Sequence, residues 1–359
     1  MHTKVTKDAF NGQKIFVGMD VHKKDFKVSV MAGGLLYKTF SSPPDGQKIV
    51  SFLQHNFPGA EYYSAYEAGF SGFWLHKQLM GLGVNSIVVN PADIPTTDKE
   101  RKQKEDRRDS RKLARDLQAG QLRAIYVPSE KTLQDRMLIR IRQTIVKEIR
   151  RTKQRIKSLL YFQGIKYPDK FAEETNHWSK NFIKWLESIS FENESAKQGL
   201  QIHIETLKHH RQLLLQTTRQ IRDLSRSDPY KQCVVALISV PGIAMLTAMY
   251  ILTELENITR FKNFNHLCSF VGLIPSTDSS GDNDRTKGIT PRRNSHLRSA
   301  LIESAWVAIR NDPALMSSYL KCCKRMASTR AIVRIAKKLL NRVVYVLRKN
   351  EKYEKNIVK

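Results

Sequence analysis

Residues 14–22 read KIFVGMDVH, an apolar run with one carboxylate near its end. The run from Ile15 to Val21 predicts a buried β-strand, and Asp20 lies inside it. A carboxylate in such a strand is costly unless a cation or hydrogen-bond donors meet it. Asp20 therefore needs a partner that the rest of the sequence must supply.

The residues that follow predict an α/β domain. Two strand-like runs, FKVSVMAGG and LLYKTFSS, are joined at Gly33 and Gly34, which is typical of a hairpin. A helix after SSPPD, the strand EYYSAYEAG, a helix over GFWLHKQLMGLG and the strand NSIVVN complete the pattern. A hairpin followed by strand–helix–strand units favours a mixed sheet with the layout of a ribonuclease-H-like fold, which we assign to residues 14–130.

Charge is the most informative bulk property. The chain of 359 residues contains 61 Lys+Arg and 34 Asp+Glu, a net charge of +27, which indicates a polyanionic partner and above all nucleic acid. No window approaches the roughly 18 apolar residues of a membrane-spanning helix, and the first residues hold no apolar signal core. We therefore expect a cytoplasmic, nucleoid-associated protein with no membrane partner. The four cysteines lack zinc-ligand spacing and fit reduced thiols.

Two helical regions follow the α/β domain. Residues 101–160 carry 19 Lys+Arg and 7 Asp+Glu, a net charge of 19 − 7 = +12, and their apolar residues recur at helical spacing. This pattern predicts a long basic amphipathic helix. Residues 196–224 place Leu200, Leu207, Leu214 and Ile221 at seven-residue spacing, which favours an imperfect coiled coil. We assign residues 131–230 to these long helices.

Residues 231–350 form the third expected domain. The segment VPGI, residues 240–243, interrupts two apolar helices, and its corner either presents backbone N–H groups to a DNA phosphate or simply turns the chain. A polar loop, PSTDSSGDNDRTKGITPRRNS, and a basic helical tail follow. Basic residues around 136–157 and 321–349 are the candidates for contact with the nucleic-acid backbone.

Further acids make Asp20 part of a pattern. Glu67 ends the strand EYYSAYE, which can run beside the strand of Asp20, while Asp106 and Asp109 are three residues apart on one helix face. Two strand carboxylates and two helix carboxylates offer the hard oxygen ligands that a pair of Mg²⁺ ions, or Mn²⁺ in their place, requires. The alternative is that the helix acids, which lie among arginines, are solvated ion-pair partners. Asp116 shares their face as a further ligand or a decoy.

Several motifs resemble one family. GMDVHK, YEAG and EDRRDSRKLA resemble the Asp-Glu-Asp-Asp signature of the DEDD transposases of insertion sequences, whose N-terminal domain is similar to the RuvC Holliday-junction resolvase. VPGI, FVGLIPSTDSSG, NSHLRSALIESAW and AKKLLNRVVYVLRKNEKY resemble the C-terminal transposase domain of the same family. The resemblance covers nearly the whole chain, with its motifs in one order. One departure is Lys104-Glu105, which replaces the usual lysine-threonine lead before the first helical acid.

This resemblance implies a recombinase that cleaves and rejoins DNA under the guidance of a structured non-coding RNA, which pairs with donor and target DNA. It implies that Asp20, Glu67, Asp106 and Asp109 are catalytic and bind Mg²⁺. It also implies that Ser280 is a nucleophile that forms a phosphoserine link to DNA, although neighbouring Ser279 leaves this choice open. A homo-oligomer, either a dimer or a tetramer, fits the recombination of two duplexes.

Two alternatives remain open from the sequence. A RuvC-like metal-dependent nuclease or resolvase needs only the four acids and uses water in place of serine. A non-catalytic nucleic-acid-binding protein needs only the basic helices. The first predicts that Ser280 is dispensable for cleavage, and the second predicts that all four carboxylates are dispensable for function.

Overall fold

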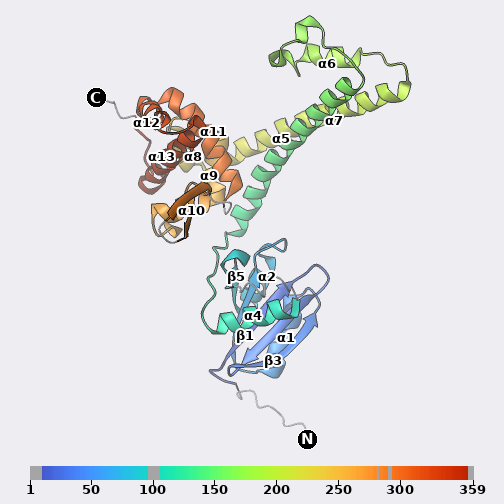
Figure 1. Ribbon diagram of the computed structural model, residues 1–359. Helices are drawn as coiled ribbons and strands as arrows, with labels where there is room; N and C mark the ends of the chain where they lie inside the picture. Colours follow the sequence, from blue (N-terminus) through green and yellow to red (C-terminus); the bar gives the residue numbers. More distant parts are fainter. Residues whose placement is uncertain (1–9, 96–105, 281–282, 290–292, 355–359) are drawn as a thin grey trace. The chain divides into compact units, whose positions relative to one another are not determined.

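The computed structural model describes residues 10–95, 106–280, 283–289 and 293–354, with side chains omitted for 106–107, 275–280 and 283–289 (Figure 1). Backbone contacts divide the chain into two units, Met1–Val127 and Pro128–Lys359. Within the described ranges, no helix combines the length and the apolar character needed to cross a membrane.

The first unit is built on a mixed five-stranded sheet in the order β3-β2-β1-β4-β5. Its first three strands, β1 (Lys14–Val21), β2 (Phe26–Ala32) and β3 (Leu35–Ser42), are antiparallel neighbours. The other two, β4 (Glu61–Glu67) and β5 (Asn85–Val89), run parallel to β1. The expected hairpin and the expected mixed sheet are therefore confirmed.

Helices cover both faces of this sheet. On one face, Ile15, Val17 and Met19 of β1 are fully buried in a core that includes residues of α1 (Gly46–Asn56) and α2 (Trp74–Gly81). On the other face, β1 and β2 pack against α4 (Asp106–Gln118). Because successive residues of a strand point to opposite faces, burial on both sides explains the nearly continuous apolar run of β1.

Gly18 is the point at which α4 approaches the sheet most closely. A Cβ atom added there would lie 2.1 Å from the carbonyl oxygen of Ser110 and 2.3 Å from the backbone nitrogen of Ala114. Beside this contact, the hydroxyl groups of Ser29 and Ser110 form a buried hydrogen bond of 2.9 Å. The absence of a side chain at residue 18 therefore allows helix backbone to lie against strand backbone.

The prediction of a single long helix over residues 101–160 is wrong. The chain forms α4 and α5 (Glu130–Phe162), separated by a segment that contains Gly120 at φ +66°. Glycine in the left-handed conformation is a common helix terminator. After it, Ile125 donates its backbone N–H to Val88, so the connecting segment pairs with the edge of the sheet. Similar basic composition on both sides of the break concealed it in the sequence.

The second unit consists mainly of helices. In Figure 1, α5 and α7 (Glu194–Ser225) run side by side, with α6 (Lys180–Glu187) near the turn between them. Leu200, Leu207 and Ile221 are buried as the seven-residue spacing predicts, while Leu214 is only partly buried. The remaining elements are α8 (Lys231–Ile238), α9 (Met245–Leu255), α10 (Phe264–Val271), β6 (Pro275–Ser280), β7 (Asn283–Ile289), α11 (Ser295–Asn311), α12 (Pro313–Cys323) and α13 (Ser328–Lys349). Short 3-10 turns lie at Pro91–Asp93, Asp169–Phe171, Glu174–Asn176 and Ile258–Arg260.

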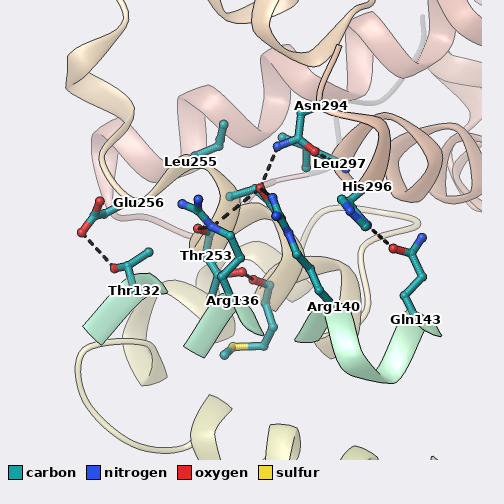
Figure 2. A network of polar contacts seen from close by, with 12 residues as sticks. Thr132, Arg136, Arg140, Gln143, Thr253, Leu255, Glu256, Asn294, His296 and Leu297 are labelled. Atoms are coloured by element: carbon teal, nitrogen blue, oxygen red, sulfur yellow. Dashed lines mark hydrogen bonds and ion pairs between the residues drawn. The ribbon is translucent and has the colours of Figure 1, made fainter. Parts of the chain in front are cut away.

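Glu254, on α9, connects three parts of this unit, and Figure 2 labels its partners Arg136, Arg140 and Asn294. Its carboxylate is 2% exposed and accepts hydrogen bonds from Arg140 Nε at 2.7 Å and Arg140 Nη2 at 2.8 Å. Asn294, just before α11, donates to the same carboxylate at 2.7 Å, and Arg136 lies 3.7 Å away. Burial alone would raise the pKa of Glu254, but the hydrogen bonds and charge of Arg140 outweigh burial and hold the pKa below its usual value.

Glu256 connects the end of α9 to the start of α5. It lies in the left-handed region at φ +58°, a conformation that costs a non-glycine residue on the order of 1 kcal/mol. Its carboxylate accepts hydrogen bonds from the Ser129 backbone N–H at 3.1 Å and from the Thr132 hydroxyl at 2.9 Å. A carboxylate at a helix N-terminus is also favoured by the helix dipole, which helps to offset the strain.

Replacement of Gly18 by alanine is expected to destabilise the first unit by roughly 1–3 kcal/mol or more, because the new methyl group meets helix backbone that cannot rotate away. Urea unfolding monitored by circular dichroism measures this loss. Gly81→Ala is the matched control, since nothing lies within 4 Å of a Cβ atom at that site. Equal stability of the two variants would contradict the close packing of α4 on β1.

Glu254→Gln is expected to destabilise the second unit by on the order of 3 kcal/mol, because two arginines lose their buried counter-charge, with part of the effect screened at half-exposed Arg140. Since the folded pKa is lowered, the stabilisation is complete above the ordinary value of 4.5 and declines as the pH falls through the folded pKa. The difference between wild type and variant should therefore shrink in acid. Exposed Glu303→Gln is the control, and a pH-independent difference would contradict the ionic account.

Candidate active site

Asp20 and Glu67 lie at the same edge of the sheet. Parallel pairing of β1 with β4 aligns Met19 with Tyr66, so the next residues, Asp20 and Glu67, continue in register at the carboxyl ends of neighbouring strands. Neighbouring strands are about 4.8 Å apart, and residues in register project to the same face. The sequence-based expectation that these two strands run side by side is correct.

Asp20 is not the fully buried carboxylate that its apolar surroundings predict. Its side chain is 23% exposed, because it lies one residue from the end of β1 at the sheet edge. His22 Nε2 lies 3.0 Å from Asp20 Oδ2 and forms a hydrogen bond with it. The sequence analysis did not single out His22 and missed this pair, although the spacing Asp-x-His at a strand end carries the signal.

The N-terminus of α4 points toward the same edge. The helix contacts Gly18 through Ser110 and Ala114, while Gln118 lies near Gly34 at the opposite end of the sheet. From Ser110 back to Asp106 the helix advances about 6 Å, and from Gly18 on to Asp20 the strand advances nearly the same distance. The backbone of Asp106 therefore lies at about the level of Asp20 along β1.

Of the two helix acids, Asp109 is the one whose side chain the structure describes. Asp109 is half-buried, one residue before the contact at Ser110, and the side chain of Asp106 lies outside the described residues. Among the side chains that are described, no group of three or more His, Cys, Asp and Glu is arranged to hold a metal ion. The donors at this edge are nevertheless carboxylate oxygens on a strand pair and a helix end, a set whose chemistry suits Mg²⁺ or Mn²⁺.

Asp116 does not belong to this edge. It lies seven residues beyond Asp109, about 10 Å further along α4 and toward the opposite end of the sheet. Its side chain is 3% exposed, Arg115 Nε lies 3.2 Å from Oδ1, and Oδ2 has no hydrogen-bond partner within the described residues. Of the two sequence-based interpretations of Asp116, the structure favours a decoy over a ligand.

The polar stretch expected as a loop after α10 instead forms a hairpin. β6 and β7 pair antiparallel, with Ser280 as the last residue of β6, opposite Asn283. A hairpin made of polar residues lacks the apolar alternation from which strands are predicted, so the sequence analysis missed it. Ser280 and Ser279 are placed here by their backbone, and their side chains lie outside the described residues.

Asn294, just before α11, is anchored by backbone and side-chain hydrogen bonds. Asn294 donates its backbone N–H to the carbonyl of Phe270 at 2.9 Å, and its side-chain oxygen accepts from Leu297, which caps α11. Its side-chain nitrogen donates to Glu254 at 2.7 Å. His296, two residues further along, forms a hydrogen bond with Gln143 of α5 (Figure 2), and burial followed by the charge of Arg140 lowers its pKa.

The VPGI corner between α8 and α9 packs tightly. Gly242 adopts φ +84°, and a Cβ atom there would lie 2.3 Å from the carbonyl oxygen of Ser304 and 2.9 Å from Ala308, both on α11. This contact favours the interpretation of the corner as a turn of the helical core.

Comparison with known protein families matches both units in order. A DEDD transposase family of the IS110 type, described as "Transposase", matches residues 17–163. The family described as "Transposase IS116/IS110/IS902 family" matches residues 235–321. The first match includes Asp20, Glu67, Asp106 and Asp109, and the second includes the hairpin with Ser280.

Individual relatives agree with these matches. The chain is 29% identical to a putative transposase, y4qE, of Sinorhizobium fredii over 82% of this chain and 72% of the relative. It is 27% identical to the transposase for insertion sequence element IS1533 of Leptospira borgpetersenii over 82% of this chain and 85% of the relative. It is also 24% identical to a pilin gene-inverting protein of Moraxella bovis over 52% and 58% of the two chains. Across both units, the chain is therefore similar to transposases of the IS110/IS116 type.

Proposed function

We propose that this protein is an RNA-guided DNA recombinase that moves an insertion sequence by cleaving and rejoining DNA through a phosphoserine intermediate. Similarity to transposase families in both parts of the chain supports DNA transposition and recombination as the general activity. The net charge of +27 suits a protein that holds DNA and a structured guide RNA together. Recombination of two duplexes also suits a homo-oligomer, a dimer or a tetramer.

The observation that carries the proposal is the edge of the first unit. Asp20 and Glu67 continue in register on parallel strands, and the helix that bears Asp106 and Asp109 begins at that edge. We assign these four acids to the binding of Mg²⁺, with Mn²⁺ as a substitute, on a sheet that we propose to be RuvC-like. Mg²⁺ bound there would neutralise phosphate charge and lower the pKa of a nearby hydroxyl group.

In the proposed reaction, His22 and Ser280 have separate roles. His22 holds one oxygen of Asp20 and so fixes the orientation of that carboxylate. Ser280 is the nucleophile: its Oγ forms a bond to phosphorus, the bond from phosphorus to one sugar oxygen breaks, and that oxygen takes up a proton while the serine proton passes to water or a carboxylate. Attack by the hydroxyl end of another strand reverses these changes, so strands can be rejoined without ATP.

Two other functions make different demands on the same residues. A water-using nuclease would cut DNA without Ser280, and a binding protein would need none of the acids. The register of Asp20 and Glu67 disfavours the binding protein, because two carboxylates at the ends of neighbouring strands repel a phosphate backbone unless a cation lies between them.

Ser280→Ala is expected to abolish the covalent protein–DNA adduct, because alanine lacks the attacking oxygen. Donor and target duplexes that carry the element's ends, incubated with the protein, guide RNA and Mg²⁺, are analysed on a denaturing gel. Ser276→Ala and Ser279→Ala are the matched controls and should retain the adduct. Cut ends that persist without any adduct in Ser280→Ala would establish the water-using nuclease instead.

Glu67→Gln and Asp20→Asn are each expected to slow strand cleavage on the order of a hundredfold or more, because a metal ligand contributes several kcal/mol of transition-state stabilisation. Binding of DNA should be unchanged or slightly stronger, since negative charge is removed. Glu61→Gln, at the opposite end of the same strand, is the control. Equal cleavage by Glu67→Gln and Glu61→Gln would exclude a metal site at this edge.

A further inference from the structure

Helix α13 concentrates positive charge on the outside of the second unit. It contains seven Lys and Arg residues and no Asp or Glu. Its buried side consists of apolar residues such as Ile335, Leu339 and Val343, whereas Arg334 and Lys338 are exposed. A helix with a packed apolar side and an outer side of one charge is suited to contact with a polyanion.

Part of this charge lines a cleft rather than an open surface. A cleft of about 650 Å³ runs between α13 and α12, with Phe264 of α10 at one wall. Basic residues of α13 supply one side, Leu315 and Ser318 of α12 supply the other, and none of the described residues that line it is Asp or Glu. The basic residues are Arg334, Lys337, Lys338 and Arg342.

Three of these cations are held in place by neighbouring elements. Lys338 Nζ donates to the Ser318 hydroxyl at 3.2 Å, and Lys337 Nζ lies 6.0 Å from the ring centre of Phe264. Arg342 forms an ion pair with Asp312, which is 3% exposed, and lies 5.0 Å from the ring centre of Tyr353. Since one carboxylate offsets only one of the four charges, the cleft keeps a strong positive potential with limited side-chain motion.

We propose that the cleft between α12 and α13 is a binding site for the phosphodiester backbone of a nucleic acid, gripped by Lys337, Lys338 and Arg334. Phosphate oxygens accept from the lysine ammonium groups, while Leu315 and Phe264 offer apolar surface to the sugars. The inference rests on the proposed function only for the class of partner, a nucleic acid. It requires neither the serine nor a metal ion.

The chemistry of the cleft favours this occupant. Ammonium and guanidinium groups in a row along one helix match the repeated charge of a phosphodiester chain, and Ser318 and Asn341 add uncharged polar groups to the lining. Duplex DNA and folded RNA share this backbone chemistry. The experiment must therefore test the two separately.

The double variant Lys337→Gln/Lys338→Gln is expected to reduce the slope of log affinity against log salt by about 2, because about one counterion is released for each phosphate contact. Binding is measured by fluorescence anisotropy with EDTA present, using a duplex DNA of arbitrary sequence and, separately, a hairpin RNA. Lys180→Gln/Lys184→Gln removes the same charge from exposed residues of α6, outside the cleft and outside both basic candidate regions, and serves as control. The thermal midpoint of each variant verifies folding.

A loss of slope in the cleft variant that exceeds the loss in the control supports the proposal, and the probe affected identifies DNA, RNA or both as the occupant. Equal losses in the two variants would show that only overall charge matters and would overturn it. Because EDTA prevents any metal-dependent cutting, failure here leaves the serine mechanism untouched. Conversely, a Ser280→Ala protein that still forms an adduct would leave the cleft untouched.

Discussion

The approach of α4 to Gly18 is the contact on which the first unit depends. Helix backbone lies against strand backbone there, at a separation that no side chain at residue 18 would permit. This contact sets both the depth and the position of the helix along β1, and the hydrogen bond between Ser29 and Ser110 supports the same position. The start of α4 consequently reaches the edge that carries Asp20 and Glu67. Gly18 in the core thus determines how close the acids at the start of α4 can lie to Asp20 and Glu67.

In the second unit, a buried charge network, instead of close backbone packing, connects the elements. Asn294 joins α10, the cap of α11 and the carboxylate of Glu254. Arg140 and Arg136 pair with that carboxylate from α5, which links the long helix to α9 and to the start of α11. A buried carboxylate such as that of Glu254 is costly unless cations and hydrogen-bond donors pair with it, and here Arg140, Arg136 and Asn294 do so.

Much of the fold could be predicted because its signals are local. The apolar run of β1, Gly33-Gly34 in the hairpin, and the regular spacing of Leu200 and Leu207 follow directly from strand, turn and helix periodicity. The break between α4 and α5 was missed because charge and spacing are alike on both sides, although Gly120, Pro128 and Ser129, the N-cap of α5, mark it. The hairpin of Ser280 was missed because polar strands show no alternation.

The candidate site was predictable to a different degree. The order of Asp20, Glu67, Asp106 and Asp109 could be recognised in the sequence, and the register of β1 with β4 agrees with the pairing expected of the first two. The contact between His22 and Asp20 was missed, although the Asp-x-His spacing at a strand end carries its signal. The remote position of Asp116 required the direction of α4, which composition does not reveal. Sequence patterns do not decide the role of a residue when that role depends on how far along a strand or helix it lies relative to its neighbours.

The most direct test of the account is to identify the residue that carries DNA. The protein is trapped with guide RNA, Mg²⁺ and donor DNA, digested with nuclease and protease, and analysed by mass spectrometry for a peptide that retains a nucleotide. The account predicts a phosphodiester-linked nucleotide on Ser280 in the wild type, and no modified peptide when Glu67 is replaced by glutamine. A nucleotide on another residue, or cut DNA without any modified peptide, would contradict it.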